Sequence, residues 1–118
     1  LIEKFMAIQA MGSETAKQDI KQIKHWVLSA PVPDLQALRA GLDILMSADL
    51  TQAFGRVEVK TSIILGKLDS LVPAKVIPHL QSLNPELAVT LIDKASHAPF
   101  VSHPEAFIQW FYQVIGKE

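Results

Sequence analysis

Apolar residues recur at helical spacing in the first ten positions of the chain. Leu1, Phe5 and Ile8 fall on one face of the helix that this spacing predicts. Gly12 then offers the left-handed backbone conformation in which many helices end. The pattern therefore predicts a short amphipathic helix that ends before Gly12.

Two further helices are predicted before residue 48. The second runs from about residue 14 to 28, and Ser13 or Thr15 can cap its start. The sequence APVPD ends it, because proline cannot continue a helix. Asp34 can cap the third helix, in which leucines recur at positions 35, 38, 42 and 45.

The pattern changes between residues 48 and 60 from helices to alternating strands and helices. The runs TSIILG (61–66) and LAVTLID (87–93) are short, apolar and rich in β-branched residues, which is typical of buried parallel strands. The segment VPAKVIPHLQSLN between them predicts a helix that Pro78 would kink. The segment SHPEAFIQWFYQVIG predicts a last helix, with Ser102 and Glu105 as a capping box and Gly116 at its end.

These elements predict an α/β fold, in which three helices over residues 1–48 precede a βαβα unit over residues 49–118. Two parallel strands are too few for a free-standing sheet. The missing strands are expected before residue 1, so the chain is expected to begin inside a longer protein. The exposed strand edge should pair with that missing part or with a second copy of the chain.

Composition narrows the class of protein without identifying its activity. The 118 residues are 49% hydrophobic and 19% charged, and a net charge of −1 implies neither nucleic-acid binding nor a polyacidic partner. The chain has no cysteine, which excludes a disulfide framework, a thiolate zinc site and a cysteine nucleophile. No residue spacing resembles a metal site. No apolar run is long enough for a membrane span and no signal peptide is recognised, so a cytoplasmic protein is expected.

Two titratable residues follow the two predicted strands. Asp69 comes after TSIILGKL, and His97 comes after LAVTLIDKAS, one strand and one helix further along. In parallel sheets, ligands bind beyond the carboxyl ends of the strands, so both residues are expected at that edge. An aspartate can orient a histidine ring whose other nitrogen accepts a proton from a serine. Each residue also has a structural interpretation, Asp69 as a turn residue and His97 as a partly buried loop residue.

Structural roles are expected for the other polar candidates. His103 precedes Pro104 and is expected in the first turn of the last helix, while His25 and His79 are expected within helices. No serine lies in the G-x-S-x-G sequence that exposes a nucleophile on a strand-turn-helix elbow. The serines that lack this context in the C-terminal part include Ser62, Ser70, Ser96 and Ser102. The chain therefore offers two of the three residues of a serine-hydrolase triad.

Lysines form a stripe on the second predicted helix. Lys17, Lys21 and Lys24 recur at helical spacing, and Lys4 lies on the helix before. The stripe is either the solvated face of an amphipathic helix or a docking surface for an acidic partner.

Three stretches of the sequence carry a resemblance to a known family. The sequences LDSLVPAKV, ASHAPFVSHPEAF and FMAIQAMGSETAKQD resemble the C-terminal half of BioH-type pimeloyl-[acyl-carrier protein] methyl ester carboxylesterases. The resemblance runs through all 118 residues and identifies residues 1–48 as a helical cap, or lid. This cap segment makes the resemblance specific. It implies an α/β-hydrolase fold and hydrolysis, without a cofactor, of the methyl ester of pimeloyl-acyl carrier protein in biotin biosynthesis.

The resemblance also implies roles for individual residues. Asp69 would be the triad acid, His97 the triad base, and Phe5 a residue that lines the acyl-chain site. Lys4, Lys17 and Lys21 take the places of arginines that contact the acyl carrier protein in this family. They keep the charge but lose the planar fork of arginine. The nucleophilic serine and the first oxyanion-hole loop would lie in the missing N-terminal half, so the chain alone is expected to be inactive.

Two other functions stay open. The chain can belong to another α/β-hydrolase, such as a general short-chain esterase or a peptidase, in which the lysines are ordinary surface residues. It can also be a non-catalytic binding or assembly module, in which Asp69 and His97 are structural.

Overall fold

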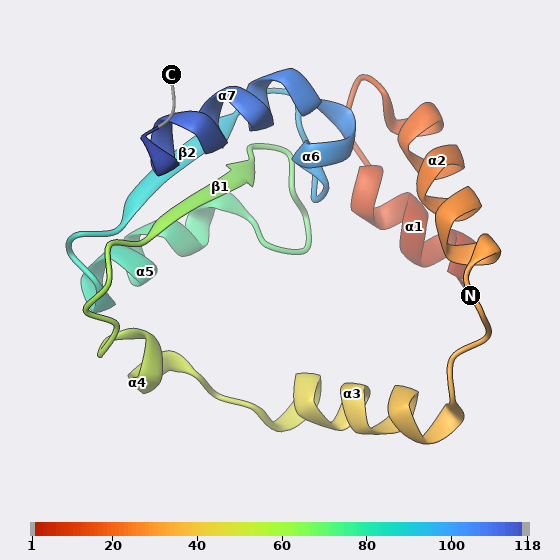
Figure 1. Ribbon diagram of the computed structural model, residues 1–118, viewed down its shortest axis with the longest axis horizontal. Helices are drawn as coiled ribbons and strands as arrows, with labels where there is room; N and C mark the ends of the chain where they lie inside the picture. Colours follow the sequence, from red (N-terminus) through yellow and green to blue (C-terminus); the bar gives the residue numbers. More distant parts are fainter. Residues whose placement is uncertain (1, 117–118) are drawn as a thin grey trace.

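The computed structural model describes residues 2–116, and helices dominate its first half. The helix that ends before Gly12 and the one that follows it form an antiparallel pair, whereas the third lies apart from both (Figure 1). A fourth, single-turn helix was not predicted. These elements are α1 (Ile2–Ala10), α2 (Ala16–Ser29), α3 (Leu35–Ser47) and α4 (Thr51–Phe54).

The second half contains the two predicted strands. They pair in parallel with Ser62 opposite Ala88 and Gly66 opposite Ile92. Within the described residues they form a two-stranded sheet, so one edge of each strand carries no neighbouring strand, as the sequence predicts. The elements are β1 (Ser62–Gly66), η1 (Ala74–Val76), α5 (Ile77–Leu83), β2 (Ala88–Ile92), α6 (Pro99–Ser102) and α7 (Pro104–Ile115).

Three predicted helix ends are confirmed. Gly12 has a φ of +90° after α1, and Gly116 closes α7 in the left-handed conformation with a φ of +68°. The Asp34 carboxylate accepts a hydrogen bond at 3.1 Å from the backbone N–H of Ala37, so it caps α3. These ends depend on local chemistry, which is why the sequence is sufficient to place them.

The predicted capping box of the last helix is wrong. The Ser102 hydroxyl donates to the carbonyl oxygen of Ala98 at 3.3 Å and also contacts the ring of His103, so it is used inside the separate turn α6. His103, not Ser102, occupies the N-cap position of α7, with a φ of −134° and a ψ of 57°. The ring of Pro104 disfavours helical backbone at the residue before it, and this separates α6 from α7.

The predicted kink at Pro78 is also wrong. The helix begins at Ile77, so Pro78 lies in its first turn, where the missing N–H costs no intrahelical hydrogen bond. A separate 3₁₀ turn, η1, precedes the helix. Proline therefore starts α5 and does not bend it.

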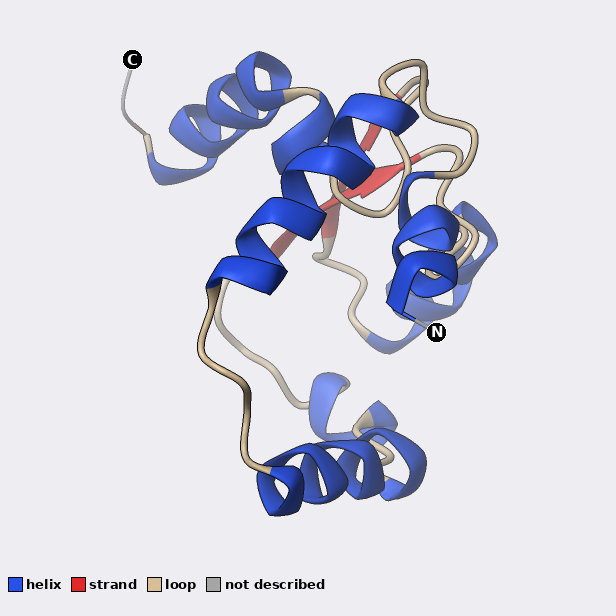
Figure 2. Cartoon of the chain, turned by 90° about the vertical axis from the view of Figure 1, so that its right-hand side faces the viewer, coloured by secondary structure: helices blue, strands red, loops and turns tan. Residues whose placement is uncertain are grey.

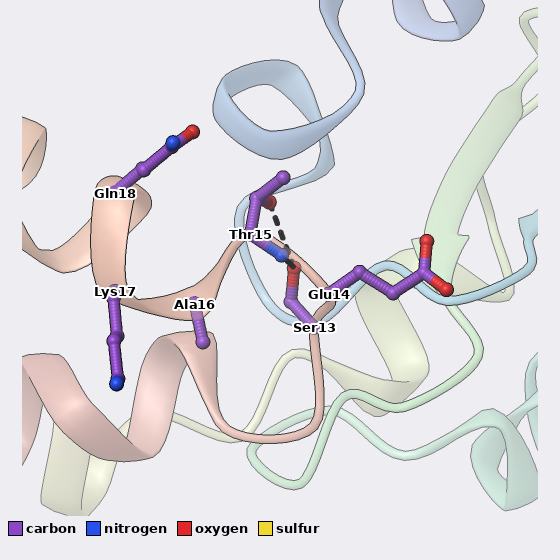
Figure 3. A pocket seen from close by; sticks show the side chains of 6 residues that line it. All are labelled: Ser13, Glu14, Thr15, Ala16, Lys17 and Gln18. Carbon is purple, nitrogen blue, oxygen red and sulfur yellow. Dashed lines mark hydrogen bonds between the residues drawn. The ribbon is translucent and has the colours of Figure 1, made fainter.

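The start of α2 differs in detail from the prediction. Thr15 is the N-cap residue, but its hydroxyl makes no capping bond and donates instead to the Asp19 carboxylate at 2.8 Å. The Ser13 hydroxyl reaches the same carboxylate oxygen at 3.2 Å and lies beside Thr15 (Figure 3). Asp19 is consequently buried, with 6% of its surface exposed, and ties the turn between α1 and α2 to the first turn of α2.

The molecule exposes more surface than a compact protein of its size. Its accessible surface is 9141 Å², whereas a compact monomer of this mass exposes about 6,300 Å². Its radius of gyration is 16.1 Å, against about 13.5 Å for a compact domain of this length. Helix α3 accounts for part of the difference, because all of its residues are exposed and it lies across from the sheet in two views (Figures 1 and 2).

Candidate active site

Asp69 lies in a tight turn directly after β1. Its backbone N–H donates to the carbonyl oxygen of Gly66 at 3.2 Å, and its Oδ1 accepts the N–H groups of Leu71 and Val72 at 2.8 and 3.0 Å. The residue is buried, with 6% of its surface exposed. These bonds fix the carboxylate and leave its second oxygen, Oδ2, to face another group.

That group is the ring of His97. Its Nδ1 lies 2.9 Å from Asp69 Oδ2, although the two residues are 28 positions apart in the chain. The His97 side chain is 36% exposed, whereas that of Asp69 is 3% exposed. A carboxylate at Nδ1 holds the neutral ring in the tautomer whose Nε2 lacks a proton, so Nε2 can act as a base.

The backbone at Gly66, the last residue of β1, lies close against the loop that carries His97. A Cβ atom at this position would lie 2.0 Å from the carbonyl oxygen of Ser96 and 2.5 Å from that of Ala95. Leu68 donates its backbone N–H to the same Ala95 oxygen at 2.9 Å. Only glycine permits this approach, a requirement that the sequence alone did not reveal.

Helix α1 also contacts the loop that carries His97. The backbone N–H of His97 donates to the carbonyl oxygen of Gln9 at 3.0 Å. Met6 and Ala10 of α1 are buried, as are Ala95 and Ala98 on either side of His97. The backbone position of His97 is therefore set by α1 as well as by the sheet.

An ion pair also joins the turn between α1 and α2 to the loop that carries His97. Lys94 Nζ lies 2.7 Å from Glu14 Oε1, and both side chains are largely exposed. The hydrogen bond to Glu14 is the main reason that the pKa of Lys94 is raised above 10.5. Lys94 has a φ of +61°, a left-handed conformation that costs a non-glycine residue about 1 kcal/mol. Neither the pair nor the strained residue was predicted, because nothing in the sequence joins Glu14 to Lys94.

The remaining polar candidates stay outside this geometry. Among the described residues, no serine side chain is hydrogen-bonded to the ring of His97. Ser96 precedes His97 but is buried, with 2% of its surface exposed, so a substrate cannot reach it. The His103 ring contacts Ser102 Oγ at 2.8 Å, while Asp93 pairs with Lys67 at 3.0 Å.

The predicted substrate-binding residues lie on α1 and α2. Lys4, Lys17 and Lys21 are exposed, and Lys17 extends away from Ser13 and Thr15 in Figure 3. Lys17 and Lys21 are four residues apart on α2 and so share one face. Phe5 is part of α1, but its side chain lies outside the described residues, so its predicted role stays a prediction.

The part of the chain that the structure describes contains no cluster of metal-binding residues and no membrane-spanning helix. No group of three or more His, Cys, Asp and Glu residues whose side chains the structure describes could hold a metal ion. No helix within the same residues is long and apolar enough to cross a membrane.

Comparison with known sequences finds esterases among the relatives of this chain. The chain is 49% identical over 108 residues to a pimeloyl-[acyl-carrier protein] methyl ester esterase of Klebsiella pneumoniae, which covers 92% of this chain and 42% of the relative. The equivalent esterase of Aeromonas hydrophila is 45% identical over 98% of this chain and 45% of its own length. The chain is therefore similar, over most of its own length, to part of these esterases. It spans less than half the length of these two curated relatives, and no family model matches it.

Solved structures support the fold. An α/β-hydrolase from a sediment metagenome of the Mar Chica lagoon, Morocco, matches 89% of the chain and 47% of its own length, with a TM-score of 0.61 and 28% identity. A serine hydrolase involved in carbazole degradation matches 87% of the chain and 34% of its own length, with a TM-score of 0.53. At 17% identity the second match shows the fold alone. The predicted α/β class and the resemblance to this family are therefore confirmed.

Proposed function

We propose that the chain is the C-terminal part of a serine carboxylesterase that hydrolyses the methyl ester of pimeloyl-acyl carrier protein. The observation that carries the proposal is the 2.9 Å contact between Asp69 and His97 beyond the carboxyl ends of two parallel strands, in a chain whose relatives bear this esterase name. Residues 1–48 form the cap and residues 49–118 the core segment. The remaining core, with the nucleophilic serine, comes from sequence outside this chain.

The large exposed surface supports a missing part of the fold. The excess over a compact monomer is roughly 2,800 Å², and the free edge of β1 or β2 leaves backbone donors and acceptors without a neighbouring strand. An N-terminal half that extends the sheet would cover the excess surface and pair with the free strand edge. We refer below to the protein that contains this chain and that half as the full-length esterase.

His97 acts as the base and then as the acid. The serine hydroxyl loses its proton to Nε2 as its oxygen attacks the ester carbonyl, and the imidazolium then gives that proton to the leaving methoxide, which departs as methanol. In the second step of the reaction, water attacks the acyl-enzyme, and the proton of the water passes through Nε2 to the serine oxygen. Asp69 orients the ring and stabilises its charged form throughout.

The exposed lysines supply a docking surface for the acidic carrier protein. Lys17 and Lys21 lie on one face of α2, and Lys4 lies on the helix that packs against it. Charges at the edge of an interface mainly raise the association rate and orient the partner.

Phe5 is proposed to line the site of the acyl chain. The enzyme is proposed to be cytoplasmic, and the lack of cysteine is consistent with this compartment.

The triad proposal is tested by His97→Ala in the full-length esterase. We expect kcat on a small methyl ester to fall by about 1,000-fold or more, because the serine loses its base. His103→Ala is the matched control, since this second half-buried histidine contacts Ser102 and should leave kcat unchanged. Unchanged turnover in His97→Ala would show that the pair is structural and would favour the non-catalytic binding module.

The docking proposal is tested by reversing two charges, Lys17→Glu and Lys21→Glu, in one variant. We expect kcat/KM for the carrier-bound ester to fall by about 10-fold at low salt, with little change for a small free ester. A variant with Lys60→Glu and Lys75→Glu changes the net charge equally at two other exposed lysines and serves as the control. Equal losses on both substrates, or no loss on either, would favour a general short-chain esterase or a peptidase.

A further inference from the structure

The segment 9–15, which comprises the end of α1 and the turn that leads to α2, contacts both loops of the Asp69–His97 pair. Gly12 faces the side chain of Leu68, so that a Cβ atom at Gly12 would lie 3.4 Å from Leu68 Cβ, one residue before Asp69. On the other side, Gln9 accepts the backbone N–H of His97. The turn thus lies where the two loops meet, although no residue of it belongs to the pair.

The 94–97 segment is held at one end by the turn and at the other by the last residues of α1. Lys94 at its start is paired with Glu14 at 2.7 Å, and His97 at its end is bonded to Gln9 at 3.0 Å. The only side-chain hydrogen bond of the His97 ring among the described residues is the one to Asp69. A shift of the turn would therefore move the His97 backbone relative to Asp69 and change where Nε2 lies.

We propose that Glu14 is a positioning residue for the esterase. Its ion pair with Lys94 holds the α1–α2 turn against the loop that carries His97, and through the Gln9 carbonyl it fixes the place of the base. Glu14 does not contact the ring and takes no part in proton transfer. The inference rests on the proposed esterase function for its kinetic effect, but its structural effect can be measured independently.

A second ion pair provides a matched control. Lys67 and Asp93 lie 3.0 Å apart and are as exposed as Glu14 and Lys94. That pair joins the ends of β1 and β2 and does not reach the cap. Glu14→Gln and Asp93→Asn therefore remove one exposed carboxylate each, and only the first removes the link between cap and loop.

The experiment measures hydrogen exchange of the His97 amide and kcat on p-nitrophenyl butyrate in the full-length esterase. Glu14→Gln should speed exchange by about 2- to 5-fold, the range expected for one exposed ion pair, and lower kcat by a similar factor at nearly constant KM. Glu14→Lys should do more, because Lys94 then meets a like charge. The double variant Glu14→Lys with Lys94→Glu should restore both values to within about 2-fold, and Asp93→Asn should change neither.

Unchanged exchange in Glu14→Lys would overturn the proposal, and so would equal changes in Asp93→Asn or a charge swap that restores nothing. A kcat that stays constant while exchange rises would show that Glu14 supports the loop without positioning the base. Should the wild type lack esterase activity, the proposed function would fail, while the exchange comparison would still decide whether Glu14 holds the loop.

Discussion

Two regions of the molecule differ in how they are held in place. One is the corner, the two loops that carry Asp69 and His97, and the other is helix α3. The corner combines a close backbone approach at Gly66, backbone bonds to Gln9 and Ala95, and a buried carboxylate, all between segments far apart in the sequence. Helix α3 has a capping aspartate and helical spacing, but every one of its residues is exposed. The comparison shows that a segment can have a definite local structure without contributing to the core.

Glycine substitutions in the two regions should have opposite effects. In Gly66→Ala, the new methyl group meets two backbone oxygens that cannot rotate away, and we expect a loss of about 3 kcal/mol in the free energy of unfolding. In Gly41→Ala, the methyl group of α3 meets nothing within 4 Å, so higher helix propensity should add up to about 1 kcal/mol.

Urea unfolding of the two full-length variants measures the contrast. A Gly66→Ala protein as stable as the wild type would mean that the Ala95–Ser96 loop moves easily, and the description of a rigid corner would then be wrong. A loss of stability in Gly41→Ala would show that α3 is packed closely in the full-length protein.

Removal of the N-cap side chain of α3 should weaken that helix alone. Asp34→Ala loses the bond to the Ala37 N–H, which should cost about 1 kcal/mol in helix stability. Faster amide exchange in the first turn of α3 is the expected result, with no change at His97. Asp43→Ala on the same helix retains the cap and is the control. An effect that spreads to His97 would show that α3 and the corner are coupled.

The smallest expected effect is the titration of Lys94. Its pKa is raised above 10.5 chiefly by the hydrogen bond to Glu14, so the ion pair is fully present below pH 10.5 and is lost as the pH rises through the higher folded-state value. The ¹³Cε chemical shift of Lys94 should titrate above 10.5, and Glu14→Gln should lower the midpoint. An equal midpoint in both proteins would show that the pair does not form in solution.

Sequence reasoning was most successful where neighbouring residues decide the structure. The caps at Asp34, Gly12 and Gly116, and both strands, follow from residue type and periodicity. Asp69 and His97 each follow one of the two predicted strands, and this predicted that they lie at the same edge of the sheet. The structure places them in contact. Their catalytic roles, like those of Phe5 and the lysines, stay predictions.

The failures have different physical causes. Ser102 and Pro78 carry signals that fit two local structures equally well, and the choice depended on the neighbouring Pro104 in one case and on where the chain turns in the other. The Glu14–Lys94 pair had no sequence signal, because it joins residues 80 positions apart.

The amino-acid sequence by itself determined the longer helices, the two strands, their order and the two polar residues that follow the strands, because each depends on the spacing of residues that are near one another in the chain. Only the tertiary structure decided which groups meet: Gly66 against Ser96, Gln9 against His97, and Glu14 against Lys94. Such contacts depend on how the chain returns to the same place in space, and no local pattern of residues encodes that distance.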